Sequence, residues 1–151
     1  MKILFVCLGN ICRSPMAHGI LHHLATKHGL QWQIDSAGTN SYHTGEAPHP
    51  SSQQVCTEHG IDISTQRART FNRLDMLEFD IIYVLAQDVY DDVKKISGHD
   101  FNTHKVKFLL DELFPNESRS VKDPWYGAID GYYPVFDEIY ACCEKIIERY
   151  A

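Results

Sequence analysis

The sequence predicts an α/β fold: a four-stranded parallel sheet with helices on both faces, in three layers. Short runs of β-forming apolar residues alternate along the chain with segments whose apolar residues recur at helical spacing, the order typical of parallel sheets. The run DIIYVL at 80–85 is almost continuously apolar, as in a strand buried on both faces. The 151 residues suffice for one domain, predicted over 1–151, and contain no linker, repeat or low-complexity tract.

Each element has its own local signal. Apolar and β-branched residues predict strands at 2–6, 32–36, 80–85 and 105–110. The first helix is expected to begin at Pro15, since proline fits the first helical position, and to end at Gly29. Further helices are predicted at 50–59, 88–96 and 132–150. A stretch rich in Gly, Pro, Ser and Thr is predicted as a loop at 37–50.

The connection at 7–14 carries a thiol, a guanidinium and a hydroxyl on one short loop. Gly9 and Asn10 tolerate positive φ, so successive backbone N–H groups can curve around an oxyanion. The positive end of the following helix points at the same space, and Arg13 adds a planar fork that pairs with two phosphate oxygens. These charges favour the thiolate form of Cys7. A thiolate held against a bound phosphate indicates phosphoryl transfer to sulfur.

The spacing Cys-x5-Arg-Ser after a hydrophobic strand resembles the signature loop of cysteine-dependent phosphatases. The sequence CLGNICRSP at 7–15, together with DPWYG at 123–127, narrows the resemblance to the low-molecular-weight protein tyrosine phosphatases. It covers nearly the whole chain and implies that family's three-layer α/β fold. It further implies hydrolysis of phosphotyrosine, and of small aryl phosphates, through a phosphocysteine intermediate without a metal or a cofactor.

The resemblance also implies roles for single residues. Cys7 is the expected nucleophile, Arg13 the expected clamp on the phosphate, and Asp123 the general acid that a poorly leaving tyrosyl oxygen requires. Ser14 is expected to stabilise the Cys7 sulfur, and Asn10 to hold the turn. The expected phosphate-binding residues are Leu8, Gly9, Asn10, Ile11, Cys12, Arg13 and Ser14.

Aromatic residues are expected to set specificity. Trp125 and Tyr126 follow the general acid, and Tyr42 lies where family members often carry an aromatic residue, so the three could line a slot for a phenyl ring. Simple core packing is the alternative for each ring. Ile11 favours an aryl substrate, because arginine-phosphatase relatives carry threonine at this position.

Cys12 resembles the family's second cysteine. A sulfenic acid on Cys7 could be trapped as a Cys7–Cys12 disulfide that thiols reverse, which would make the enzyme redox-sensitive. The alternative is a small side chain that fills the loop floor.

The chain departs from the family pattern twice. Gln66 stands where members often carry histidine before Lys/Arg-Ala-Arg, and the stretch 85–89 (LAQDV) replaces Met-Asp-x-x-Asn. The first departure concerns the hydrogen-bond network behind the phosphate-binding loop. The second concerns the wall that supports this loop.

Two other functions compete with this one. Thioredoxin-linked arsenate reductases use a similar loop, but they relay oxidation through two further cysteines after the third strand, and 85–101 contains none. A non-catalytic phosphotyrosine-binding module is expected to lack Cys7 or Asp123, and both are present.

Composition bounds the partners and the compartment. The net charge of −6 disfavours nucleic acid and anionic membranes, and no segment approaches a membrane span. Five cysteines and the absence of a signal peptide pattern predict a soluble, cytoplasmic protein in a reducing compartment. The expected partner is a phosphotyrosine protein, with inorganic phosphate as product. For a bacterium, the resemblance implies a tyrosine kinase of a polysaccharide-export system.

Overall fold

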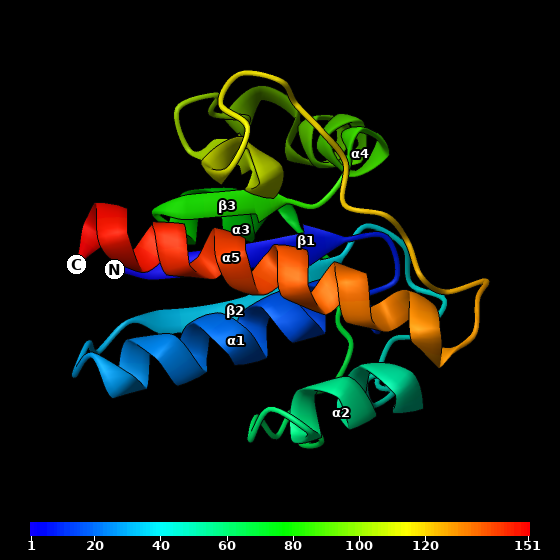
Figure 1. Cartoon of the computed structure of the whole chain (residues 1–151). Coiled ribbons are helices and arrows are strands. Elements are labelled where there is room, and N and C mark those ends of the chain that lie inside the picture. Colours follow the sequence, from blue (N-terminus) through cyan, green and yellow to red (C-terminus); the bar gives the residue numbers. More distant parts are fainter.

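A four-stranded, all-parallel sheet forms the centre of the protein, with strand order β2-β1-β3-β4 (Figure 1). The computed structural model describes residues 1–151. The strands are β1 (Lys2–Cys7), β2 (Gln33–Gly38), β3 (Ile81–Val84) and β4 (Val106–Phe108). The sheet confirms the predicted fold class. Because β1 lies in the middle of the sheet, the loop at its carboxyl end stands where parallel sheets place their ligands.

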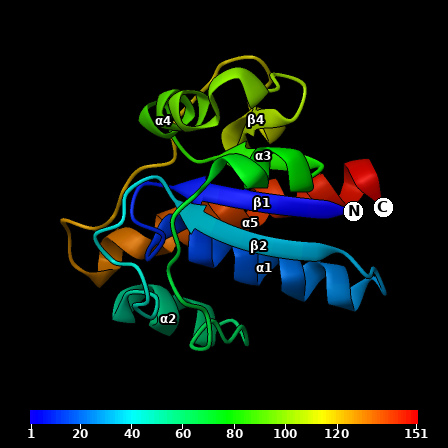
Figure 2. The same ribbon diagram turned by 180° about the vertical axis from the view of Figure 1, so that it is seen from behind.

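Helices cover both faces of the sheet (Figures 1 and 2). On one face lie α1 (Arg13–Lys27), α2 (Pro50–Thr57) and α5 (Tyr132–Tyr150), and on the other α3 (Arg73–Glu78) and α4 (Gln87–Ser97). Side chains of β1 alternate between the two cores. Ile3 and Phe5 belong to a core of 30 buried residues with α1 and α5, whereas Leu4 and Val6 belong to one of 13 with α3 and α4. None of these helices is long and apolar enough to cross a bilayer.

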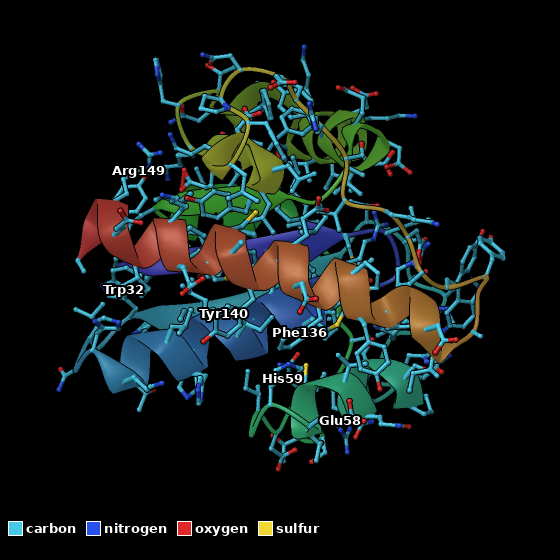
Figure 3. All side chains as sticks on the ribbon, viewed as in Figure 1. Trp32, Glu58, His59, Phe136, Tyr140 and Arg149 are labelled. Carbon is cyan, nitrogen blue, oxygen red and sulfur yellow. The ribbon has the colours of Figure 1, made fainter.

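Contacts at the C-terminal end of helix α2 tie it to α5, and Figure 3 labels Glu58, His59 and Phe136 among them. The ring of His59 stacks on Phe136 with 4.2 Å between ring centroids. The Tyr133 hydroxyl donates to Glu58 at 3.1 Å. The loop 39–49 leads into α2 and borders the cavity at the carboxyl end of β1. The contacts between α2 and α5 therefore anchor the helix that follows this loop.

Several boundaries differ from the sequence prediction by one or two residues, and the start of the first helix and the end of the fourth strand are two of them. Pro15, expected at the first helical position, is the third residue of α1, which begins at Arg13. A proline is tolerated there because the first four N–H groups of a helix have no partner within it. The fourth strand ends at Phe108, where a 3₁₀ turn (Leu109–Glu112) replaces the expected end of the strand.

Helix α3 was missed altogether. Its six residues are too few to display a helical period. Its local signal is a capping box: the Leu74 N–H donates to the Asn72 side chain at 2.9 Å, and the Asn72 N–H donates to the Asp75 carboxylate at 3.0 Å.

Candidate active site

Three loops meet beyond the carboxyl end of β1: residues 7–13, 39–49 and 120–128 (Figure 1). They enclose a cavity of about 180 Å3. The cavity is lined by all three residues predicted to be catalytic, Cys7, Arg13 and Asp123. Ile11 and the three predicted pocket rings line it as well. Cys7 and Asp123, which are 116 positions apart in the sequence, thus border one small space.

Cys7 ends β1, and its side chain receives two hydrogen-bond partners. Its sulfur lies 2.9 Å from the Ser14 hydroxyl and accepts from the Asn10 N–H at 3.3 Å. Asn10 has φ 57°, the left-handed region, and this turn directs its N–H back toward the sulfur. Both partners suit a negatively charged sulfur, because each can donate a proton to it.

The Asn10 carboxamide is fully used. Its Nδ2 donates to Ser14 at 2.8 Å and to Ser36 at 3.0 Å, and its Oδ1 accepts from the Arg69 N–H at 3.0 Å. Because the Ser14 oxygen accepts from Asn10, its own proton is free to point at the Cys7 sulfur. Asn10 is 3% exposed, so this bond set holds the turn from within the protein.

Arg13 is the first residue of α1 and is buried. Its Nη1 donates to the Val121 carbonyl at 3.0 Å, and its Nη2 lies 3.7 Å from the Asp123 carboxylate. The remaining N–H donors of the guanidinium make no hydrogen bond within the chain, and the residue lines the cavity. Arg13 therefore joins the phosphate loop to the Asp123 loop and retains donors for an anion.

The Asp123 loop is held by aromatic contacts that no local sequence signal predicts. The Trp125 N–H donates to the Asp123 carboxylate at 3.1 Å. The indole packs between two imidazoles, with its centroid 5.3 Å from each of His43 and His49. His49 stacks in turn on Tyr132 at 5.4 Å. Nothing in local spacing marks these histidines, because they meet Trp125 only through the fold.

The other two predicted pocket rings stand at the mouth of the cavity. Tyr42 is 84% and Tyr126 is 92% exposed, while Trp125 is 39% exposed. Such exposure rules out core packing for Tyr42 and Tyr126. An entering group would pass the exposed rings before it reached the buried Ile11 and Arg13, which line the same cavity.

Cys12 lies on the buried floor of the loop. Its sulfur is 3.5 Å from the Tyr132 hydroxyl, and its carbonyl accepts from Ser52 at 3.3 Å. Burial, together with the smaller effect of the nearby Cys7 charge, raises the pKa of Cys12 to about 11. Cys12 is therefore a protonated thiol at neutral pH, and all five cysteines of the chain are free.

Gln66, the first departure noted in the sequence, does not reach the serines behind the loop. Its Nε2 donates to the Pro15 carbonyl at 3.2 Å. Instead, His18 of α1 places its Nδ1 3.3 Å from the Ser36 hydroxyl. Burial lowers the pKa of His18, with Asp35 acting in the opposite direction. His18 was not predicted as a site residue, and the sequence signal that points to it is its spacing of four from Ser14, which puts both residues on one helical face.

We expect His18 to destabilise the fold as the pH falls. Because burial lowers its pKa below the ordinary 6.5, the unfolded chain takes up the proton first, and stability is lost as the pH falls from 6.5 toward the folded-state pKa. The variant His18→Asn lacks this titration. Thermal unfolding at about pH 7.5 and about pH 5.5 should show a smaller decrease in Tm for the variant than for the wild type. Equal decreases would contradict this expectation.

A cysteine at the carboxyl end of a parallel strand, with an arginine and an aspartate on the same cavity, is the arrangement expected of a cysteine-dependent phosphatase. The family profile described as "Low molecular weight phosphotyrosine protein phosphatase" matches residues 2–151. This chain belongs to the low molecular weight phosphotyrosine protein phosphatase family.

Relatives and solved structures agree with this assignment. The low molecular weight protein-tyrosine-phosphatase YfkJ of Bacillus subtilis is 36% identical, covering 97% of this chain and 94% of that protein. The low molecular weight phosphotyrosine protein phosphatase of Dictyostelium discoideum is 35% identical, covering 98% of this chain and 92% of the relative. The crystal structure of YfkJ superposes with a TM-score of 0.89 at 35% identity, over 99% of this chain and 93% of that one. A drosophila arginine phosphatase superposes with a TM-score of 0.91 at 32% identity, over 99% and 98%.

Proposed function

We propose that this protein hydrolyses phosphotyrosine in proteins, and small aryl phosphates, through a phosphocysteine intermediate on Cys7. The observation that carries the proposal is the shared cavity, in which the sulfur of Cys7, the guanidinium of Arg13 and the carboxylate of Asp123 face one space of about 180 Å3. Membership of the phosphatase family supports the same chemistry.

In the first step, the thiolate of Cys7 attacks phosphorus in line with the tyrosyl oxygen. The S–P bond forms as the P–O bond breaks, and Asp123 gives its proton to the leaving oxygen. Arg13 and the loop N–H groups stabilise the charge on the equatorial oxygens, a task that a metal ion performs in other phosphatases.

In the second step, the Asp123 carboxylate removes a proton from water, and the water oxygen attacks phosphorus. The S–P bond breaks, inorganic phosphate leaves, and the sulfur departs as a thiolate. The Ser14 hydroxyl, 2.9 Å from that sulfur, stabilises the developing charge.

Asp123→Ala should separate the acid from the nucleophile. Hydrolysis of phosphotyrosine should slow severely, because the tyrosyl oxygen, with a pKa of about 10, leaves poorly as an anion. For 4-nitrophenyl phosphate, whose phenol is far more acidic, the burst of phenol release should be much less affected. The burst is the quantity to compare, since the second step still needs Asp123 as base. Equal slowing of both bursts would mean that Asp123 only holds its loop in place.

The second candidate substrate is phosphoarginine, because a drosophila arginine phosphatase shares the fold. The apolar Ile11 on the cavity wall and the three rings at the rim favour an aryl group instead. Rates should therefore be compared on one peptide sequence carrying phosphotyrosine, phosphoserine or phosphoarginine. We expect kcat/KM for phosphotyrosine to exceed the others by about a hundredfold or more. A larger value for phosphoarginine would overturn the proposed substrate.

Redox control and a cytoplasmic location belong to the same proposal. A peroxide would oxidise Cys7 to a sulfenic acid, and the neighbouring Cys12 thiol would displace water to form a disulfide. Cys7 and Cys12 line the same cavity of about 180 Å3, which supports this pairing. For a bacterial cell, a tyrosine kinase of polysaccharide export is the proposed partner.

A further inference from the structure

A chain of hydrogen bonds runs behind the phosphate loop from helix α1 to the sulfur of Cys7. His18 Nδ1 lies 3.3 Å from the Ser36 hydroxyl, and Asn10 Nδ2 donates to Ser36 at 3.0 Å and to Ser14 at 2.8 Å. The Ser14 hydroxyl lies 2.9 Å from the sulfur. We propose that neutral His18 is a positioning residue, which accepts the Ser36 proton and thereby keeps Ser14 aimed at Cys7. This inference rests on the proposed function, in which Cys7 is the nucleophile.

The number of available protons decides which atom donates and which accepts in each of these hydrogen bonds. The Ser36 oxygen already accepts from Asn10, so its single proton needs another acceptor. Ser36 is 5% exposed, and His18 Nδ1 is the protein acceptor that lies within hydrogen-bond distance of the Ser36 hydroxyl. A buried hydroxyl that lacked this acceptor would be free to rotate its proton toward Asn10 and oppose the Asn10 N–H. The neutral ring therefore locks the Ser36 hydroxyl, and with it the Asn10 carboxamide.

A protonated His18 would reverse this arrangement. Its Nδ1 would then carry a proton that faces the Ser36 proton, so one of the two would lose its partner. Asp35 of β2 favours that charged form, while burial and His22 of α1 oppose it. Arg69 weakens the pull of Asp35 by pairing with its carboxylate at 3.1 Å. Asp62 borders the same cavity as His18 from the loop after α2 and is fully exposed to solvent screening.

The side chain at position 18 can be tested by two readouts. The first is the pH dependence of Cys7 alkylation by iodoacetamide, followed by the mass of the Cys7 peptide, which needs no substrate. The second is kcat and KM for 4-nitrophenyl phosphate. His18→Leu should lower kcat about tenfold with little change in KM, the effect of losing one oriented hydrogen bond. It should also move the alkylation curve to higher pH, because the thiolate loses an aligned donor.

Conservative and control variants define the specificity of the effect. His18→Asn should restore kcat to within about threefold of wild type, since an amide oxygen can take the place of Nδ1 as acceptor. The control variant is His23→Leu. His23 lies on the same helix and lines the same cavity as His18, but it makes no hydrogen bond to Ser36, Asn10 or Ser14. This variant should leave both readouts unchanged.

Ser36→Ala tests the route by which His18 acts and covers the case in which His18→Leu fails to fold. If His18 works through Ser36, the double variant should be no slower than Ser36→Ala alone. Additive losses, or a His18→Leu protein with wild-type kcat and alkylation curve, would overturn the inference. A wild-type protein that does not hydrolyse phosphotyrosine would instead refute the proposed function, and the alkylation curves would still test the network.

Discussion

Cys7→Ser should abolish the hydrolysis of aryl phosphates while leaving the binding of inorganic phosphate largely intact. A serine hydroxyl does not ionise in the cradle and cannot replace the thiolate as nucleophile. The loop N–H groups and the buried Arg13 guanidinium remain in place, so the anion site persists. We expect turnover of 4-nitrophenyl phosphate below about one hundredth of the wild-type value, with a Kd for phosphate within about threefold by calorimetry.

The neighbouring cysteine provides the matched control. Cys12→Ser makes the same substitution in the same loop, at a thiol that is protonated and hydrogen-bonded to Tyr132. Its turnover should stay within about tenfold of wild type, because only one floor contact changes. A Cys7→Ser protein with more than about one hundredth of wild-type activity would remove Cys7 as the nucleophile.

Arg13→Lys should be nearly as damaging, although the charge is kept. One ammonium group cannot form two parallel N–H···O bonds to the equatorial phosphate oxygens. The structure adds a second reason, since Arg13 also donates to the Val121 carbonyl and lies 3.7 Å from Asp123. A lysine would therefore weaken both the anion site and its link to the acid loop.

The expected loss in kcat for Arg13→Lys is roughly two powers of ten or more, as when a transition-state donor is removed. Steady-state kinetics on 4-nitrophenyl phosphate measures it, and vanadate affinity shows whether anion binding falls in parallel. Near-normal kinetics would mean that Arg13 contributes only bulk positive charge.

Much of the fold and the loop could be predicted because their signals are local. The apolar run at 80–85 and the spacing between Cys7 and Arg13 are visible within a few residues of sequence. The role expected for Asp123 depends on the family resemblance. The fold places Asp123 on the same cavity as Cys7, and no local sequence pattern predicts that the two residues meet there.

What could not be predicted depends on contacts between distant segments. Trp125 is held by His43 and His49, which precede it by more than 70 residues, and no spacing rule relates them. The loss of a family histidine at Gln66 pointed to the network behind the loop, but not to the residue that completes it. His18 takes that place because the face of α1 that carries Ser14 packs against β2 and Ser36.

The central claim is that Cys7 carries the phosphoryl group between the two steps. Asp123→Ala slows the second step, so this variant should accumulate the intermediate after mixing with 4-nitrophenyl phosphate. Intact-mass spectrometry during the burst, followed by peptide mapping, is the direct measurement. We predict one phosphoryl group per protein molecule, located on the sulfur of Cys7. A burst of phenol without a phosphorylated protein, or with the phosphoryl group on another residue, would contradict the account.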